Sequence, residues 1–286
     1  MPAIRIDGRK LASAHLSRLQ AEIAEFTGRS DAVPQLAVVR VGADQASASY
    51  ARQIRRTFER RGASSFEIEL PADADADQTL AEIRRLNADP DVHGIMLQAP
   101  LPAGIPWRLA ADAIDPEKDV DGATSTNLGL LAAGDGSAIP PATPAGGMEI
   151  LRASGATISG SLTTVVGRSN VVGLPLALML VRAHSTVTVC HTRTQDMAAA
   201  CRTADILCVA AGRPRLITAD MVKPGAFVLD FGVNFDDGAM IGDVAFKEVA
   251  DVAGAITPVP GGTGPMTNAC LLANTLRAAQ VAANLA

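Results

Sequence analysis

The chain has 286 residues, of which 48% are hydrophobic, and its formal net charge is −5 at pH 7. This length is enough for two domains that each bury a core of their own. Charges of both signs are spread along the chain without a basic run, which argues against nucleic-acid binding and against attachment to a membrane surface.

The first half of the chain alternates helical and strand patterns, which is typical of parallel sheets joined by crossover helices. Apolar residues at helical spacing predict helices over 8–27, 46–61 and 78–87, and apolar runs predict strands over 36–41, 66–70 and 94–98. Residues 72–77 form a polar linker into the third of these helices. Asp, Gly and Pro predict loops over 115–123 and 134–144.

The second half of the chain begins a new β–α–β series. Strands are predicted over 162–166, 186–190, 205–210 and 226–231. The first of them is followed by a turn from Gly167 to Gly173, and the helix after this turn runs to about Ala183. Residues 257–264 are predicted to be a loop, and a long helix rich in Ala and Leu closes the chain. The expected fold class is therefore α/β with parallel sheets.

The cysteines and histidines give no sign of a cofactor that they would hold. Cys190, Cys201, Cys208 and Cys270 form no Cys-x-x-Cys pair, and several lie in apolar runs. Free buried thiols in a reducing cytoplasm are the expected state. The four histidines have no metal-ligand spacing, so no metal site is expected. No segment has the length and apolar character of a signal peptide or a membrane span.

A glycine turn follows the predicted strand over 162–166. The sequence Leu162-Thr-Thr-Val-Val-Gly167-Arg-Ser-Asn-Val-Val-Gly173 has the order of strand, turn and helix start. This order suits phosphate binding, because backbone N–H groups and the positive end of the helix dipole face the anion. The full Gly-x-Gly-x-x-Gly pattern is missing, and a glycine after a strand is common in α/β proteins. An ordinary structural turn is therefore the alternative interpretation.

The end of the next strand indicates which nucleotide would bind. Domains that prefer NAD usually carry an acidic residue there for the ribose hydroxyls, but this chain reads Val189-Cys-His-Thr-Arg193. Arg193 and Arg168 could instead hold a 2′-phosphate by charge-assisted hydrogen bonds. We therefore predict NADP rather than NAD as the cofactor. An exposed arginine at a helix start is the alternative for Arg193.

Six segments, taken in order, resemble the bifunctional methylenetetrahydrofolate dehydrogenase/methenyltetrahydrofolate cyclohydrolase (FolD-type) family. They are Ile6-Asp-Gly8, Ala46-Ser-Ala-Ser-Tyr50, Gly94-Ile-Met-Leu-Gln-Ala-Pro-Leu-Pro102, Pro116-Glu-Lys-Asp-Val-Asp-Gly122, Gly167-Arg-Ser-Asn-Val-Val-Gly-Leu-Pro175 and Pro258-Val-Pro-Gly-Gly-Thr-Gly-Pro-Met-Thr267. The resemblance covers nearly the whole chain. It implies two α/β domains across a cleft, with a folate-binding domain at about residues 1–140 and a Rossmann-like domain at about 141–270. It also implies that a last helix, about 271–286, packs on the first domain, and that the protein is a homodimer.

The resemblance also implies the residues of both binding sites. A ring at Tyr50 could stack on the pterin of a tetrahydrofolate derivative, Gln98 is a polar site residue, and the Asp121 carboxylate would accept hydrogen bonds from pterin N–H groups. The ordinary alternatives are a core tyrosine, a strand-end glutamine and a turn aspartate. The residues implied to bind NADP are Gly167, Arg168, Ser169, Gly173, Thr192, Arg193, Val233, Thr257, Pro258 and Gly262.

The chain departs from the family at one position that bears on catalysis. Family members carry a lysine four residues after the site tyrosine, on the same helical face, and this chain has Ile54 there. Arg55 and Arg56 are neighbours in sequence but point off that face. Lys118 lies in a loop where the family already has a lysine, so it is not an obvious replacement.

The two reactions of the family make different demands on this position. The dehydrogenase step moves a hydride from the methylene carbon to the nicotinamide and needs no general base, so positioning can supply much of the rate. The cyclohydrolase step adds water and requires proton transfers, which a lysine and its glutamine neighbour can manage and isoleucine cannot. We therefore predict an NADP-dependent dehydrogenase with weak or absent cyclohydrolase activity. The alternatives are a fully bifunctional enzyme, a dehydrogenase for another one-carbon pterin carrier, and a non-catalytic relative that binds folate or NADP.

Overall fold

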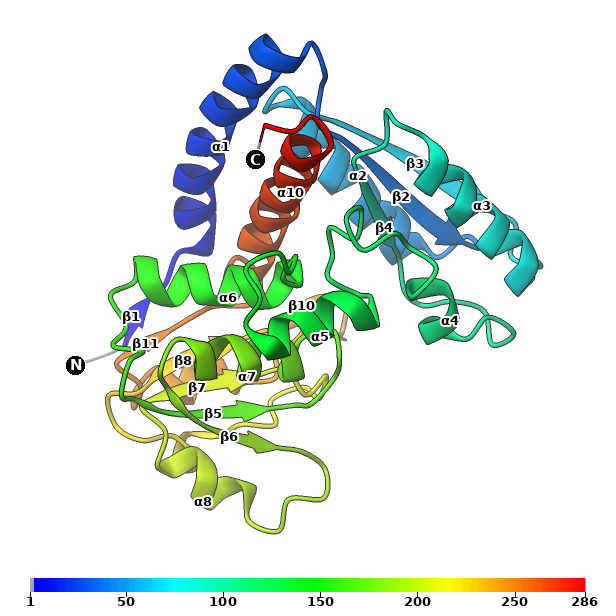
Figure 1. The fold of residues 1–286 in the computed structure, drawn as a ribbon. Coiled ribbons are helices and arrows are strands. Elements are labelled where there is room, and N and C mark those ends of the chain that lie inside the picture. Colours follow the sequence, from blue (N-terminus) through cyan, green and yellow to red (C-terminus); the bar gives the residue numbers. More distant parts are fainter. Residues whose placement is uncertain (1–2, 286) are drawn as a thin grey trace. The chain divides into compact units, whose positions relative to one another are not determined.

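The computed structural model describes residues 3–285, which form two compact units (Figure 1). The six-stranded unit comprises Met1–Ser13 and Thr143–Thr267, and the three-stranded unit comprises Ala14–Ala142 and Asn268–Ala286. Each is named for its main sheet. Every strand pair in these two sheets is parallel, which confirms the predicted α/β class.

The three-stranded unit has the strand order β3-β2-β4. Its central strand β2 (Gln35–Val41) is buried in all but its first residue, because it lies between β3 (Ser64–Leu70) and β4 (Gly94–Leu97) and carries an almost unbroken apolar run. Helix α2 (Gln45–Glu59) follows β2, and α3 (Ala76–Ala88) follows β3. The core of the unit includes Val39, Ile83, Leu86, Ile95 and Ile114.

Several helix boundaries differ from the predicted ones. Helix α1 (Gly8–Ser30) continues past Gly28, because Ile23 and Phe26 pack in the core and outweigh the weak helix preference of one glycine. The short helices α4 (Trp107–Ala111) and α5 (Ser125–Ala133) were not predicted, and α6 (Ala142–Ala153) begins inside the predicted loop over 134–144. Helices of five to nine residues show too little periodicity to be found from sequence.

The last helix, α10 (Thr263–Ala282), contributes its residues from Asn268 onward to the three-stranded unit. The Asn274 side chain donates hydrogen bonds to the carbonyl oxygens of Val120 (2.8 Å) and Pro140 (2.9 Å). The Arg277 guanidinium donates to the carbonyl of Ala138 at 2.9 Å. These bonds hold the helix against the segment that ends in Asp121.

The six-stranded unit has the strand order β1-β11-β8-β7-β5-β6. Its strands are β1 (Ile4–Arg5), β5 (Leu162–Val166), β6 (Thr186–Cys190), β7 (Ile206–Val209), β8 (Phe227–Asp230) and β11 (Ala255–Ile256). The amino-terminal residues belong here rather than to a domain over 1–140, because Ile4 pairs with Ala255 at the edge of the sheet.

The order of these strands creates a switch point. The chain passes from β5 to β6 on one side, and then crosses back so that β7 lies on the other side of β5. Ligands of open α/β sheets bind beyond the carboxyl ends of the strands at such a point. Helix α7 (Gly173–Arg182) starts there after β5, and α8 (Met197–Arg202) follows β6.

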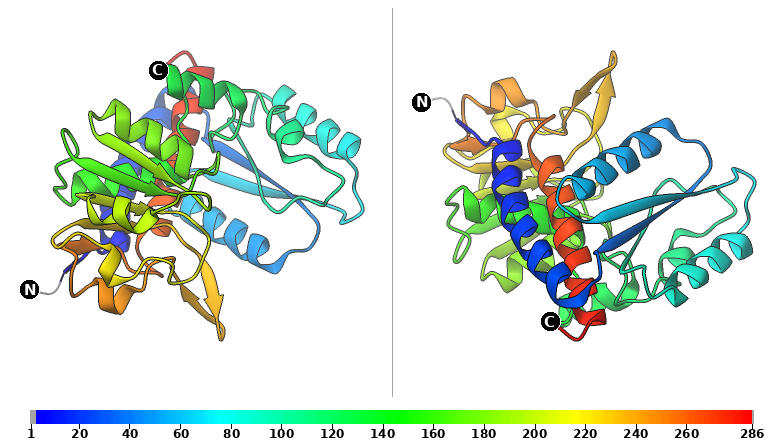
Figure 2. Two further views of the ribbon diagram at one scale, coloured as in Figure 1. Left: turned by 90° about the horizontal axis from the view of Figure 1, so that it is seen from below. Right: turned by 90° about the horizontal axis from the view of Figure 1, so that it is seen from above.

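The remaining elements of this unit are short. They are the 3-10 helix η1 (Ala219–Met221), helix α9 (Phe246–Val249), and a hairpin formed by β9 (Asn234–Asp236) and β10 (Ala239–Ile241). Figure 2 shows this hairpin projecting from the rest of the unit. Its side chains Phe235 and Met240 are exposed, as is Val233 just before it.

Candidate active site

The three side chains implied for folate binding lie near the carboxyl edge of the three-stranded sheet. Tyr50 lies on α2, which follows β2, and Gln98 directly follows β4. Asp121 follows residues 118–120, which run parallel to β4 with Ile95 paired to Asp119. Parallel strands end at the same edge of a sheet, so these three positions share one region of the unit.

Two observations tie the three segments together. The Ser47 hydroxyl oxygen on α2 lies 3.2 Å from the carbonyl oxygen of Ala99, the residue after Gln98. The negative charge of Asp121 acts on the Tyr50 hydroxyl and helps to raise its pKa. The structure therefore brings Tyr50 and Asp121 close to each other, and it places α2 against the residue that follows Gln98.

Both ionisable groups of this site have shifted pKa values. Burial raises the pKa of Asp121 to about 7; the charge of Asp119 also raises it, and a hydrogen bond from the backbone N–H of Ala142 opposes the shift. Burial, followed by the charge of Asp121, raises the pKa of Tyr50 above its ordinary value. Tyr50 therefore stays protonated at neutral pH, while Asp121 changes its charge within the physiological range.

Ile54 lies one helical turn after Tyr50 and is 0% exposed. It belongs to the buried face of α2, together with Ala51 and Phe58. Gln98 is 4% exposed, and its side-chain oxygen Oε1 has no hydrogen-bond partner among the described residues. A buried amide oxygen without a donor is uncommon in folded proteins.

The neighbouring basic residues do not take the place of a lysine at position 54. The ammonium group of Lys118 donates to the carbonyl oxygens of Leu86 (3.2 Å), Asn87 (2.8 Å) and Asp89 (2.6 Å) at the end of α3. It therefore caps a helix. Arg55 and Arg56 are exposed, as their predicted direction off the Tyr50 face requires.

Asp119 has a structural role that was not predicted from the sequence. It is fully buried and accepts hydrogen bonds from the backbone N–H groups of Ala123 and Thr124, both at 2.9 Å, and from the Asn127 side chain at 2.9 Å. These bonds fix the turn around Asp121. In the motif Asp119-Val-Asp121, both oxygens of the first carboxylate accept hydrogen bonds within the turn, whereas the second carboxylate accepts one from the backbone N–H of Ala142.

The implied nucleotide residues all follow the carboxyl ends of strands in the six-stranded sheet. The turn after β5 is tight. Gly167 has φ +127°, and a Cβ there would lie 2.1 Å from the carbonyl oxygen of Ala210. A Cβ at Gly173 would lie 2.2 Å from the carbonyl oxygen of Gly167. Both positions therefore require glycine, and the turn has the close backbone approach of a phosphate cradle.

Among the side chains around this turn, one serine hydroxyl is hydrogen-bonded to the backbone and several others are exposed. The Ser169 hydroxyl accepts from the backbone N–H of Val172, the residue before α7, at 3.2 Å and so closes the turn. Arg168 is exposed, and so are Thr192 and Arg193 after β6. The turn after β6 is shaped by His191, whose ring nitrogen Nδ1 accepts from the N–H of Arg193 at 3.1 Å. Two exposed arginines thus follow adjacent strands, β5 and β6.

The other implied cofactor residues follow β8 and β11. Val233 is exposed beyond β8. Thr257 is fully buried, and its hydroxyl accepts from the backbone N–H of Asp230 at 2.8 Å. A Cβ at Gly262 would lie 2.5 Å from the carbonyl oxygen of Pro258, so the loop after β11 folds back tightly on itself.

Sequence reasoning missed two buried carboxylates in this unit, Asp230 and Asp243. Asp230 accepts from the N–H groups of Gly232 (2.8 Å), Asp243 (3.0 Å) and Val244 (2.9 Å). Burial raises the pKa of Asp230 to about 6, against the effect of these three bonds. An aspartate inside an apolar run such as Met240-Ile-Gly-Asp-Val244 is the signal that could have found Asp243, because a buried charge requires partners.

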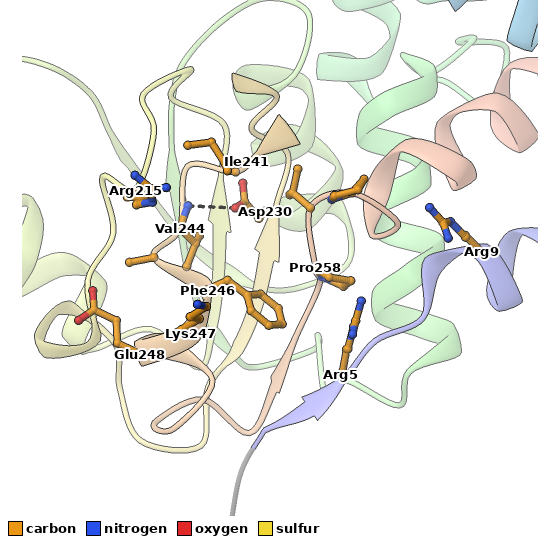
Figure 3. A pocket seen from close by; sticks show the side chains of 14 residues that line it. Arg5, Arg9, Arg215, Asp230, Ile241, Val244, Phe246, Lys247, Glu248 and Pro258 are labelled. Carbon is orange, nitrogen blue, oxygen red and sulfur yellow. Dashed lines mark hydrogen bonds between the residues drawn. The ribbon is translucent and has the colours of Figure 1, made fainter. Parts of the chain in front are cut away.

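A pocket of about 800 Å³ opens in the six-stranded unit beside these groups (Figure 3). Its wall includes Asp230, Val244, Phe246 and Pro258, and Arg5 lies at its rim. Of the residues implied to bind the nucleotide, Pro258 alone lines this pocket. The glycine turn after β5 is therefore a different part of the unit.

Among residues 3–285, no helix combines the length and hydropathy needed to cross a bilayer. Across the same described part of the chain, no group of three or more His, Cys, Asp or Glu residues has an arrangement that could hold a metal ion.

The fold and the glycine cradle define an α/β protein with one unit of the dinucleotide-binding type. Two family models match the chain: the tetrahydrofolate dehydrogenase/cyclohydrolase catalytic domain at residues 6–121, and the NAD(P)-binding domain of the same proteins at residues 141–283. The chain belongs to the tetrahydrofolate dehydrogenase/cyclohydrolase family, which confirms the predicted family and a nicotinamide nucleotide as cofactor.

Individual relatives agree with this assignment over nearly their full length. The chain is 50% identical to the bifunctional protein FolD of Chloroflexus aggregans over 97% of this chain and 98% of the relative. The structure of the bifunctional enzyme FolD from Campylobacter jejuni matches with a TM-score of 0.95 and 39% identity, over 98% of this chain and 99% of that one. The FolD protein of Trypanosoma brucei, solved with NADP cofactor and inhibitor, matches with a TM-score of 0.94 and 37% identity over 98% of each chain.

Proposed function

We propose that this protein oxidises 5,10-methylenetetrahydrofolate to 5,10-methenyltetrahydrofolate with NADP, and that its cyclohydrolase activity is weak or absent. The family supports the dehydrogenase reaction. The observation that carries the second part is Ile54, which is fully buried at the position where the resemblance expects a lysine.

The six-stranded unit fits NADP. The turn at Gly167 and Gly173 packs backbone against backbone too closely for a Cβ at either position, and it lies between the end of β5 and the start of α7, where sheets of this type bind the pyrophosphate. Arg193 and Arg168 are free to hold the 2′-phosphate, and no acidic residue at the end of β6 opposes that charge. When bound, NADP accepts the hydride. The solved relative with NADP supports the same choice.

The three-stranded unit fits the folate. The Tyr50 ring offers a flat surface for the pterin, and ionised Asp121 offers acceptors for the pterin N–H groups. Neither group needs to take a proton from carbon for hydride transfer to occur. Orientation of the methylene carbon is what these side chains contribute.

Hydrolysis of the methenyl product also needs a positioned acid or base, and position 54 supplies none. Water must be activated and protons moved, and a positioned acid or base contributes about 10²–10⁴-fold to such steps. Ile54 can do neither, Lys118 is committed to the end of α3, and Gln98 Oε1 has no donor among the described residues. This arrangement supports loss of the cyclohydrolase step while the dehydrogenase step is kept.

The alternative is a fully bifunctional enzyme, which the names of relatives that are 50% identical to this chain favour. Two assays on the purified protein decide between them. Addition of 5,10-methylenetetrahydrofolate and NADP should yield NADPH, and its absence would overturn the dehydrogenase. Added 5,10-methenyltetrahydrofolate should decay no faster than in buffer, whereas rapid enzyme-dependent decay would establish the bifunctional alternative.

We further propose that the protein is a cytoplasmic homodimer. The exposed apolar side chains Phe235 and Met240 of the β9–β10 hairpin support a contact surface there. The cysteines Cys190, Cys201, Cys208 and Cys270 are buried, which agrees with a reducing compartment. Light scattering on the eluted protein should give twice the chain mass of 29.5 kDa, and a mass of one chain would contradict the dimer.

A further inference from the structure

We propose that Asp243 is a positioning residue for NADP: its buried carboxylate holds the loops after β7 and β8 in the shape that the nucleotide requires. The inference rests on the proposed function, because it assumes that NADP binds at the carboxyl edge of the six-stranded sheet. It concerns a side chain that lies beneath these loops.

Asp243 is 0% exposed, and both of its carboxylate oxygens are used. Oδ2 accepts from the N–H groups of Ala211 at 2.6 Å and Gly212 at 2.8 Å. Oδ1 accepts from the N–H of Arg213 at 2.9 Å and from the Asn234 side chain at 2.9 Å. Three consecutive backbone N–H groups after β7 and one side chain after β8 therefore converge on a single carboxylate.

The loop after β7 is in contact with the phosphate cradle. The N–H of Ala210 donates to the carbonyl of Val166 at 2.7 Å, and the carbonyl oxygen of Ala210 lies where a Cβ at Gly167 would be placed. Gly212 and Arg213 are exposed, although their N–H groups are bonded to the buried Asp243 carboxylate. The carboxylate thus fixes the loop from below, and the outer side stays accessible to a ligand.

Two glycines leave the space that this arrangement needs. A Cβ at Gly232 would lie 2.4 Å from the carboxylate carbon of Asp243, and a Cβ at Gly242 would lie 1.8 Å from Asp230 Oδ2. Asp230 accepts from the N–H of Asp243 and so holds the backbone of the positioning residue itself. Figure 3 shows the neighbouring bond from the N–H of Val244 to Asp230. The two carboxylates form one connected support under both loops.

Asparagine at position 243 cannot reproduce this support. Each carboxylate oxygen accepts two hydrogen bonds, so either orientation of an amide would place its NH2 group against two donors. The loops after β7 and β8 would then shift. The nucleotide would bind more weakly, while the folate residues Tyr50, Gln98 and Asp121 belong to the other unit.

The test compares Asp243→Asn with the full-length wild type by isothermal titration with NADP and by kinetics with both substrates. We expect the Kd and KM for NADP to rise at least about tenfold, with the KM for methylenetetrahydrofolate and kcat at saturating NADP within about twofold of wild type. The matched control is Asp205→Asn. Asp205 accepts from the N–H of Leu162 at 2.9 Å and pairs with Lys223 at the amino ends of the same strands. This control should lower Tm and leave the Kd for NADP unchanged.

A milder variant covers the case in which Asp243→Asn does not fold. Asn234→Ala removes one of the four donors and keeps the buried charge, and it should raise the Kd for NADP about threefold. An unchanged Kd in a folded Asp243→Asn protein, or in Asn234→Ala when the first variant is insoluble, would overturn the inference. Failure of the wild type to bind NADP would instead overturn the proposed function.

Discussion

In the six-stranded unit the proposed nucleotide site is formed largely by backbone, whereas in the three-stranded unit the proposed folate site depends on individual side chains. Gly167 and Gly173 shape the cradle through the absence of a Cβ, and Asp243 holds the adjacent loop by its N–H groups. Tyr50, Gln98 and Asp121 act through their own ring, amide and carboxylate. A substitution that adds a Cβ to the glycine turn should disturb binding of the whole nucleotide. A substitution in the folate site should remove only the reaction step that needs the replaced side chain. Isoleucine in place of lysine at position 54 can therefore remove the cyclohydrolase reaction and leave the dehydrogenase reaction.

The largest effect is expected where the backbone site has no spare space. Gly167→Ala places a Cβ 2.1 Å from the carbonyl oxygen of Ala210. Overpacking of this kind costs about 3 kcal/mol, so the Kd for NADP, measured by titration, should rise about 100-fold. Gly160→Ala is the matched control, because Gly160 also has a positive φ (+80°) but a Cβ added there would have open space within 4 Å. Equal NADP binding by Gly167→Ala and wild type would contradict the cradle.

The next effect concerns the choice of nucleotide. Arg193→Ala removes a charge that is free to bind the 2′-phosphate, so kcat/KM for NADP should fall about 10- to 100-fold, while that for NAD stays unchanged. Arg202→Ala, an exposed arginine at the end of α8, serves as the control and should change neither value. A parallel fall with both nucleotides would show that Arg193 does not read the phosphate.

The side-chain site should respond to pH. Because the pKa of Asp121 is raised to about 7, the carboxylate is protonated below that pH and loses acceptors for the pterin. The kcat/KM for methylenetetrahydrofolate, which reports on the free enzyme, should therefore fall by up to about tenfold per pH unit below about 7. Steady-state rates measured between about pH 6 and pH 9 test this, with Asp121→Asn as the variant whose profile should be flat. A wild-type profile with no change near pH 7 would contradict the assignment.

The smallest effect on activity is expected at Lys118. Lys118→Met keeps the length of the side chain and removes three hydrogen bonds to the end of α3. The free energy of unfolding in urea should fall by about 1–3 kcal/mol, with dehydrogenase rates within about twofold of wild type. Lys247→Met, at an exposed position, should change neither quantity. A large loss of activity without loss of stability would place Lys118 in the site after all.

The long apolar runs were predictable from sequence, and the short elements were not. The strands β2, β5 and β6 lie within one residue of their predicted bounds. The buried strand β2 reads as an almost continuous apolar run, whereas β5 and the edge strand β6 are short runs rich in Val and Thr, residues that favour strands. The strands β1 and β11 have only two residues each and exist because each pairs with a neighbour far away in the sequence. No local pattern marks such a strand.

The same division applies to the candidate sites. The glycine turn at Gly167 follows from a local rule about strand, turn and helix. The proposed role of Asp243 depends on hydrogen bonds from residues 30–32 positions earlier in the chain. No local sequence pattern indicates bonds over such a separation. In the Asp119-Val-Asp121 motif, the fold had to be known before one carboxylate could be assigned to the turn and the other to the site.

The most direct test of the account compares wild type, Ile54→Lys and Ile54→Met in both half-reactions. Methionine fills the buried position without a proton to exchange, so it controls for repacking of α2. The account predicts NADPH formation by all three proteins, and methenyltetrahydrofolate hydrolysis that rises at least about 100-fold in Ile54→Lys alone. Rapid hydrolysis by the wild type, or hydrolysis that is equal in a folded Ile54→Lys and in Ile54→Met, would contradict it.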